Sequence, residues 1–238
     1  MKRLISAVLF SVIAISAGAT DFFSTGKSDD LFTIGARLGI NTSNRTVDKN
    51  AAGSYNFQSW GTGFTAGVTA SINIRDYLSI EPGLFFESRS GHSSFTSFPI
   101  PLDNGTTCYV TQSAHRHTYN FNIPVLASMR FNVTQGLRWH VDFGPYVAFT
   151  LKSKLENKEL LSTRPDLDNE VPFSAKAAPV DFGFKMGTAF EIIGRYYVGV
   201  HYEAGVVKAY SDKSIGNGLE KIYGGRTKAW NFTIGYNF

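Results

Sequence analysis

The sequence lacks most of the features that stabilise or anchor a small exported protein. It contains a single cysteine, Cys108, so no disulfide can form within the chain. After residue 19, no apolar run approaches the ~18 residues that a membrane-spanning helix requires. Lysine and arginine form no cluster of the kind that would indicate a nucleic-acid partner. Two classes remain, a soluble protein and a β-barrel that crosses a membrane with strands.

The N-terminus has the pattern of a secretory signal. Lys2 and Arg3 precede an apolar stretch over residues 4–15, and Ala17-Gly18-Ala19 matches a small-residue cleavage site. The stretch is short for a stable transmembrane helix, although a retained hydrophobic helix is the alternative. We therefore expect export, with cleavage after Ala19. Without the first two basic residues, the formal charge falls from +4 to +2.

Glycines and aromatic residues are abundant, and the aromatics recur at every second position. In the last ten residues the large apolar side chains alternate with small or polar ones, which predicts a strand with one apolar face. The same alternation occurs seven more times. The eight expected strands are 31–41, 63–74, 77–88, 118–132, 137–151, 180–193, 196–207 and 229–238.

The connections between these strands alternate in length. Short turns lie at 75–76, 133–136 and 194–195, whereas the other links span residues 42–62, 89–117, 152–179 and 208–228. This pattern is typical of outer-membrane barrels, in which periplasmic turns are short, outer loops are long and an even strand number returns the chain to its starting side. We therefore predict an all-β fold: an eight-stranded antiparallel up-and-down transmembrane β-barrel. The predicted divisions are a signal peptide at 1–19, a lead-in at 20–30 and a barrel domain at 31–238.

The two faces of these strands differ in charge. The apolar faces carry no Asp, Glu, Lys or Arg, whereas the opposite faces are charged and rich in glycine, as expected when one face meets lipid and the other the lumen. Arg130 is also assigned to the lumen, but a bulge at Pro124 would reverse its direction. The remaining predicted lumen cluster, to which we assign a structural role, comprises Arg37, Glu81, Glu87, Arg138, His140, Asp142, Asp181, Lys185, Glu191, His201 and Glu203.

Three proline-containing segments carry a family resemblance. Residues 81–86 (EPGLFF), 119–126 (YNFNIPVL) and 143–147 (FGPYV) resemble the PorT-like outer-membrane β-barrel family, as does the final strand. The resemblance implies an eight-stranded outer-membrane barrel, and some members of the family are linked to secretion and gliding. It also implies that Phe238 is the end recognised by the barrel assembly machinery.

The polar residues give little indication of catalysis. The lumen list mixes both signs of charge, which favours ion pairs that fill the interior over a selectivity ring. His92, His115 and His117 lie near the second long connection, but their spacing defines neither a metal site nor a triad. We therefore predict no catalytic, cofactor or metal site.

The expected function is structural or interaction-based. The predicted location is the outer membrane, with the lipid bilayer as one partner and a protein or glycan at the outer loops as another. A narrow pore or a secretion-associated barrel is the second interpretation, and a barrel-embedded enzyme is the third. No nucleic-acid partner is expected.

Overall fold

The structure is an eight-stranded antiparallel ring, as predicted. The computed structural model describes residues 22–28, 30–46, 54–97, 100, 101, 105, 107, 108, 110–162, 177–209 and 225–238. Around the closed barrel the strands follow the order β1-β10-β9-β8-β7-β6-β3-β2, and β4 and β5 form a separate two-residue ladder. The bounds are β1 (Phe32–Thr46), β2 (Ser54–Arg75), β3 (Leu78–Ser97), β4 (Ile100–Pro101), β5 (Thr107–Cys108), β6 (Val110–Thr134), β7 (Leu137–Ser162), β8 (Val180–Ile192), β9 (Tyr196–Lys208) and β10 (Arg226–Asn237).

The described residues include no helix that is long and apolar enough to cross a membrane.

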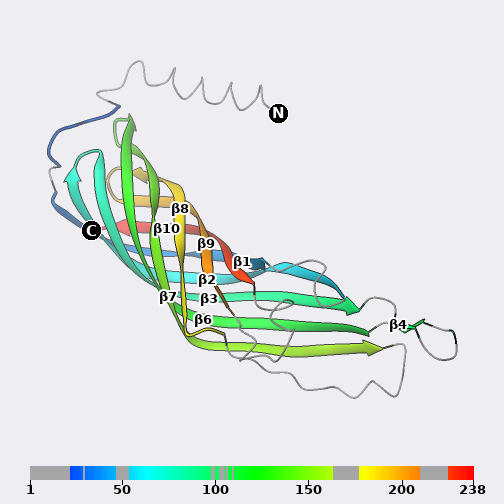
Figure 1. Cartoon of the computed structure of the whole chain (residues 1–238). Helices are drawn as coiled ribbons and strands as arrows, with labels where there is room; N and C mark the ends of the chain where they lie inside the picture. The colour runs from blue at the N-terminus through cyan, green and yellow to red at the C-terminus, as the bar shows by residue number, and fades with distance from the viewer. Residues whose placement is uncertain are drawn as a thin grey trace, which may run out of the picture.

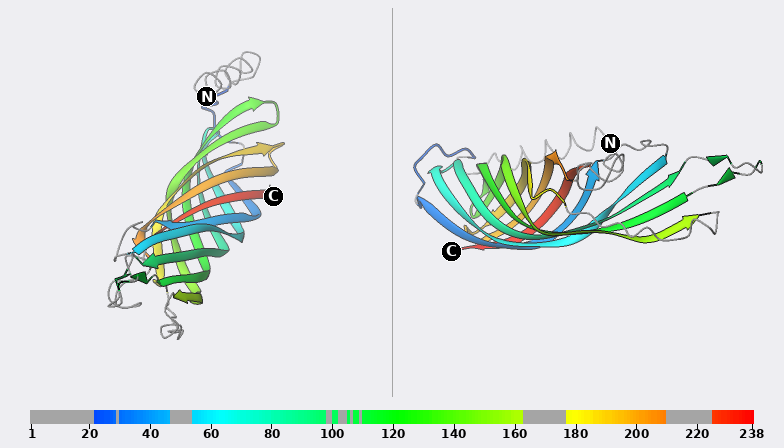
Figure 2. Two further views of the ribbon diagram at one scale, coloured as in Figure 1. Left: turned by 90° about the vertical axis from the view of Figure 1, so that its right-hand side faces the viewer. Right: turned by 60° about the horizontal axis from the view of Figure 1, so that its bottom comes forward.

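The first and last strands close the ring. β1 pairs with β10 from Gly35↔Asn237 to Thr46↔Arg226, and on its other side it pairs with β2. The short connections and the C-terminus lie at one end of the barrel, here called the turn end, and the long connections lie at the other, the loop end (Figures 1 and 2). The expected signal at residues 1–19 lies outside the described residues.

Side-chain exposure is inverted relative to a water-soluble barrel. On β10, Phe232 is 44% exposed and Ile234 is 61% exposed. Asn231, which precedes Phe232 on the same strand and points to the opposite face, is 1% exposed. Most other strands show the same alternation, with apolar side chains outside and polar side chains buried. The outer surface is therefore an apolar band, which is stable in lipid rather than in water.

Strands β2, β3, β6 and β7 continue beyond the closed ring. The pairing of β1 with β2 ends at Ser43↔Gly61, and the pairing of β7 with β8 ends at Phe149↔Val180. Beyond these points the inner pairs continue to Ser54↔Ser97 and Val110↔Ser162. We call this extension, formed by residues 54–60, 90–97, 110–118 and 151–162, the outer sheet; it projects from the loop end in Figure 1.

The outer sheet corrects the expected loop lengths. Much of the predicted connections 42–62, 89–117 and 152–179 is strand. The apolar alternation used to place the strands is weak there, because both faces carry serine, threonine, histidine and charged residues. A strand outside the lipid needs no continuous apolar face, so its hydrophobic period is lost while its hydrogen-bonded pairing remains.

The three strand prolines cause no bulge. Pro82↔Val125 and Phe85↔Asn122 keep one register, as do Pro124↔Tyr146 and Ala127↔Phe143. The possible reversal after Pro124 therefore does not occur, and Arg130 points into the lumen with 6% exposure. The register shifts between β6 and β7 lie elsewhere, at Ser113/Ala114, Tyr119/Asn120 and Asn132/Thr134.

The N-terminal lead-in follows the rim at the turn end. Backbone hydrogen bonds join Asn132 N to Phe22 O at 3.0 Å and Asp76 N to Gly26 O at 3.2 Å. The Phe22 ring stacks on Phe131 with centroids 5.3 Å apart, and Phe23 lies 4.5 Å from Tyr77. The lead-in thereby links β1 to the β2–β3 turn and to β6, within an aromatic group suited to a lipid–water interface.

Replacing Phe232 tests whether the outer face meets lipid. Phe232 lies midway along β10, so Phe232→Arg should lower the free energy of unfolding by about 2–4 kcal/mol in phospholipid vesicles, measured by urea titration. Phe232→Leu is the matched control, because it keeps an apolar side chain. Equal stability of the arginine and leucine variants would show that this face is not in the membrane.

Candidate functional site

The predicted lumen residues all lie on the inner side of the strands. Nine of the eleven are buried, while Arg138 and Asp181 are partly exposed near the two ends. They do not form one site. Ten of them separate along the barrel axis into a central cluster, two cross-strand pairs and a network at the turn end, whereas Asp181 accepts a hydrogen bond from the Tyr146 hydroxyl at 3.3 Å.

The central cluster contains two carboxylates and two cations. Arg89 donates from Nε to Glu87 Oε2 at 2.9 Å, and its Nη2 contacts both Glu87 and Glu203. Lys185 Nζ lies 3.0 Å from Glu203 Oε1. Asn122 Nδ2 donates to Glu87 Oε1 and Glu203 Oε1, each at 3.0 Å. We call these five residues the cross-barrel cluster; its formal charge is balanced, and each side chain is nearly or fully buried.

The cross-barrel cluster spans the barrel interior. Arg89 and Glu87 come from β3 and Glu203 comes from β9, and three strands separate β3 from β9 in either direction around the ring. The contact between Arg89 and Glu203 therefore joins opposite walls. Lys185 on β8 and Asn122 on β6 fill in from the intervening side. Ion pairs in such a buried setting are strongly coupled, so removing one member leaves an uncompensated charge.

Arg89 and Asn122 were missed by the sequence interpretation. Residue 89 was placed at the start of a loop, whereas β3 continues to Ser97. The spacing offered a usable signal, because Arg89 is two positions after Glu87 and alternate residues of a strand share a face. Asn122 lies between the apolar Phe121 and Ile123 on β6, so the alternation also directs it into the lumen. Its uncharged amide gives no charge signal that would single it out from the sequence.

Glycines allow lumen side chains two strands apart to meet. In one row of the sheet Asp142, Gly187 and His201 are aligned across β7, β8 and β9, and His201 Nε2 lies 2.8 Å from Asp142 Oδ2. A Cβ on Gly187 would lie 2.5 Å from the His201 ring. Glycine is therefore required for this contact, since any larger residue would occupy the space of the imidazole.

A second row repeats the arrangement. Arg37, Gly235 and Tyr197 are aligned across β1, β10 and β9, and the Arg37 guanidinium lies 4.0 Å from the Tyr197 ring centroid. A Cβ on Gly235 would lie 2.5 Å from Arg37 Cδ. The planar guanidinium lies over the aromatic face, a favourable cation–π geometry. Three of the predicted lumen residues, Asp142, His201 and Arg37, thus make contacts across an intervening strand.

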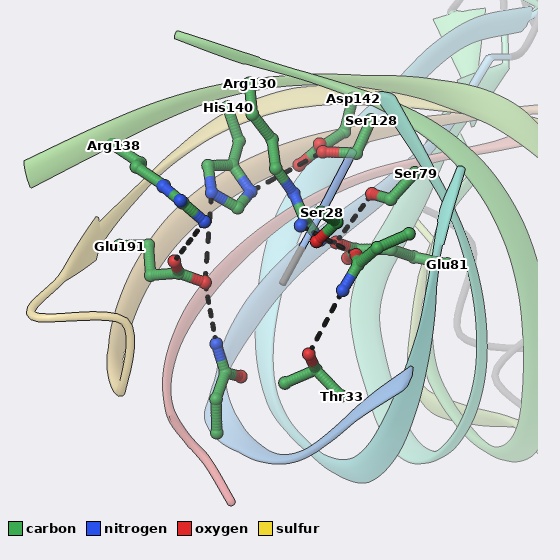
Figure 3. Close-up of polar contacts among 12 residues, drawn as sticks. Ser28, Thr33, Ser79, Glu81, Ser128, Arg130, Arg138, His140, Asp142 and Glu191 are labelled. Carbon is green, nitrogen blue, oxygen red and sulfur yellow. Dashed lines mark hydrogen bonds and ion pairs between the residues drawn. The ribbon is translucent and has the colours of Figure 1, made fainter. Parts of the chain in front are cut away.

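A separate polar network occupies the turn end (Figure 3). Arg130 donates to Asn73 Oδ1 at 2.7 Å and to Glu81 Oε1 at 3.0 Å. Arg138 donates to Asp76 Oδ1 at 3.0 Å and lies 3.8 Å from Glu191. These bonds tie the walls of the barrel together where the apolar band ends.

Ser128, His140 and Glu191 form a chain of hydroxyl, imidazole and carboxylate, as in a hydrolytic triad, but the distances between them do not match a triad. Ser128 Oγ lies 3.5 Å from His140 Nδ1, and His140 Nε2 lies 4.0 Å from Glu191 Oε2. The second distance exceeds a hydrogen bond. Ser128 is 0% exposed, and neither it nor His140 lines the cavity at the turn end. The arrangement is that of a packed polar interior.

The cavities in the lumen differ in size between the turn end and the interior. A cavity of about 600 Å³ opens at the turn end and is lined by Arg130, Arg138, Glu191 and Arg195 among others. Further in, one cavity beside Lys185 and Phe85 and another beside Arg89 and Asp181 each measure about 30 Å³. Because a water molecule needs roughly 10–15 Å³ by such a measure, each inner cavity has room for only a few waters. Among these cavities, the wide one at the turn end is therefore followed farther in only by spaces for a few waters.

The histidines at the second connection lie on strands. His92 on β3 is paired with His115 on β6, and both lie on the outward side of the outer sheet. Cys108 lies in β5. In the described part of the chain, no group of three or more histidine, cysteine, aspartate or glutamate residues has the geometry of a metal site.

A family model agrees with this architecture. The model described as "Outer membrane protein beta-barrel domain" matches residues 25–209. The chain belongs to this family. The predicted location is thereby confirmed: the barrel lies in the outer membrane. Comparison with curated proteins gives no match.

Solved outer-membrane proteins show limited similarity to the chain. Ail of Yersinia pestis, solved with the heparin analogue sucrose octasulfate, is 12% identical with a TM-score of 0.40; the match covers 87% of this chain and 99% of Ail. OprG of Pseudomonas aeruginosa is 10% identical with a TM-score of 0.42, over 90% of this chain and 99% of OprG. Family membership rests on the domain match and not on these values.

Replacing Arg89 tests the cross-barrel cluster. Arg89→Met leaves Glu87 and Glu203 with only Lys185 and Asn122, and it should lower the free energy of unfolding by about 3–5 kcal/mol. Adding Glu87→Gln should recover part of this loss, because one uncompensated carboxylate is removed. Arg226→Met, at an exposed cation of β10, is the control and should change stability by less than about 0.5 kcal/mol. Urea unfolding in detergent or vesicles measures all three, and equal effects at 89 and 226 would contradict the assignment.

Proposed function

We propose that the protein is an outer-membrane anchor with a closed lumen, which holds its outer sheet and outer loops in place to contact another protein or a glycan. The single observation that carries the proposal is the cross-barrel cluster. A chain that served as an open channel would need a continuous polar path, whereas here Arg89 and Glu203 join opposite walls. The barrel then serves as a support for the residues outside it.

The mixed charge of the interior favours a structural role. Selective pores present rings of one sign or rings of carbonyl oxygens to the passing ion. The cross-barrel cluster instead pairs each carboxylate with a cation and with Asn122. Moving an ion through it would require breaking buried, charge-assisted hydrogen bonds. A narrow pore is therefore the less favoured function.

The outer sheet provides a rigid platform for binding. Its four strands continue the barrel wall through hydrogen-bonded pairing, so loops attached to it start from fixed positions. Two large aromatic residues of β2 are exposed near its base, Phe57 at 61% and Trp60 at 47%. Aromatic side chains supply much of the binding free energy in protein interfaces. This supports surface contact as the functional class.

Three finer assignments belong to the same proposal. Absence of enzymatic activity is supported by the poor geometry of Ser128, His140 and Glu191 described above. Membership of the PorT-like branch rests on the three proline-containing segments of the sequence. Recognition by the barrel assembly machinery is supported by Phe238, which is 80% exposed at the free end of the closing strand.

Conductance measurements test the closed lumen. In planar lipid bilayers the purified protein should show no steady single-channel steps. The triple variant Glu87→Ala, Arg89→Ala, Glu203→Ala removes the groups that join the walls and should introduce a small conductance, provided that its heat-modifiable gel mobility shows a folded barrel. Steady conductance by the unaltered protein would overturn the closed-lumen proposal.

Trimming the outer sheet tests surface binding. Gly91 and Arg116 face each other in the register, so residues 92–115 can be replaced by a two-residue Asn-Gly turn without touching Arg89. Bacteria displaying the full and trimmed proteins would be compared for adhesion to a panel of glycans and host-matrix proteins, with folding checked by gel mobility. Loss of adhesion to at least one surface is expected. Identical adhesion by both would leave residues 92–115 without a binding role.

A further inference from the structure

The histidines of the chain divide into two groups. Of five in total, His140 and His201 are buried in the lumen. The other three, His92, His115 and His117, lie together on the outward side of the outer sheet, outside the ring of eight strands. The second group has no part in the closed lumen or in the apolar band. Its chemistry is therefore unexplained by the anchor function.

His92 and His115 form a cross-strand pair. They stand opposite each other in the β3–β6 register, so their side chains leave the sheet on the same face. Their ring centroids lie 4.7 Å apart, with an interplanar angle of 76°. On the same face, Ser94 pairs with Ser113 on one side of the pair, and Ser90 pairs with His117 on the other. The pair is open to solvent on its outer side, because His115 is exposed and His92 is half-buried.

This spacing fits chelation of one metal ion. An ion ~2.0–2.1 Å from one nitrogen of each imidazole would place the ring centroids roughly 4.5 Å apart at a 90° ligand angle and about 5.2 Å apart at a tetrahedral angle. The observed 4.7 Å falls between these two geometries. Rotation about the Cβ–Cγ bond, which has a broad energy profile in histidine, brings either nitrogen toward the ion.

We propose that His92 and His115 bind a divalent transition-metal ion, Cu²⁺, Ni²⁺ or Zn²⁺, across β3 and β6 on the outer surface. Imidazole is a preferred ligand for these three metals, and Cu²⁺ should bind most tightly. Water completes the coordination, which agrees with the absence of any three-residue ligand group in the described residues. The bound ion links two neighbouring strands at the base of the outer sheet.

His117 serves as the internal control. It lies on the same face, two positions along β6 from His115, but opposite Ser90 rather than opposite His92. Lys154 occupies the facing register position on β7, which makes this position less favourable for a cation. His117 also lies 6.4 Å from the Tyr119 ring in a stacked arrangement. His117 is therefore a neighbouring imidazole that we do not expect to bind the metal ion.

The experiment titrates CuCl₂ and NiCl₂ into the folded full-length mature chain in detergent micelles, without a histidine tag and with Cys108→Ser to remove the thiol. Calorimetry should give one ion per chain, and the Cu²⁺ electron paramagnetic resonance spectrum should show two equivalent nitrogen ligands. His92→Asn and His115→Asn should each weaken binding by about tenfold or more, whereas His117→Asn should change it by less than about threefold. Gel mobility confirms that every variant is folded.

Three results would overturn the proposal: no saturable binding by the unaltered chain, equal binding by the His92→Asn or His115→Asn variant, or a loss at His117→Asn as large as at the other two. The site does not depend on the proposed surface partner or on the closed lumen. Its failure would therefore leave the anchor function standing, and its success would not establish that function.

Discussion

The fold depends on placing charge inside a ring too narrow for bulk water. Lipid outside excludes charge from the outer face, so all polar side chains within the band must satisfy one another across a small space. At the centre of the barrel, Arg89 neutralises two buried carboxylates, because it contacts Glu87 on its own strand and Glu203 on the opposite wall. Gly187 and Gly235 allow further polar contacts, because each leaves space for the side chains of the two flanking strands to meet over it. The contacts inside the ring thus connect its opposite walls.

Much of the fold was predictable because lipid imposes a strict rule on the sequence. Apolar residues at every second position located all eight strands, and residues 229–238 correspond closely to β10 at Arg226–Asn237. The rule holds only within the bilayer. In the outer sheet, the faces that would be apolar within the bilayer carry serine and histidine. The apolar alternation is therefore missing there, and the sequence predicts loops in place of these strands. The same limit hid Arg89, which lies just beyond the predicted end of its strand.

The candidate site was predictable in composition but not in connectivity. Alternation indicates that Asp142 and His201 share the lumen, yet only the register reveals that Gly187 separates them and permits their contact. Likewise the sequence placed Pro124 inside a strand without showing that pairing resumes in the same register after it. Register arises from hydrogen bonding between distant segments, and no local pattern encodes it fully. The pairing of His92 with His115 was unavailable to sequence reasoning for this reason.

Closure of the ring has a consequence for how the chain reaches this state. Gly35 pairs with Asn237, so the first and last strands meet only after nearly the whole sequence has been made. The contact between Arg89 and Glu203 likewise joins residues 114 positions apart. Such long-range contacts give a high contact order, which is associated with slow folding. Burial of the Arg89–Glu203 contact therefore requires that β3 and β9 have already come to opposite walls of the same ring.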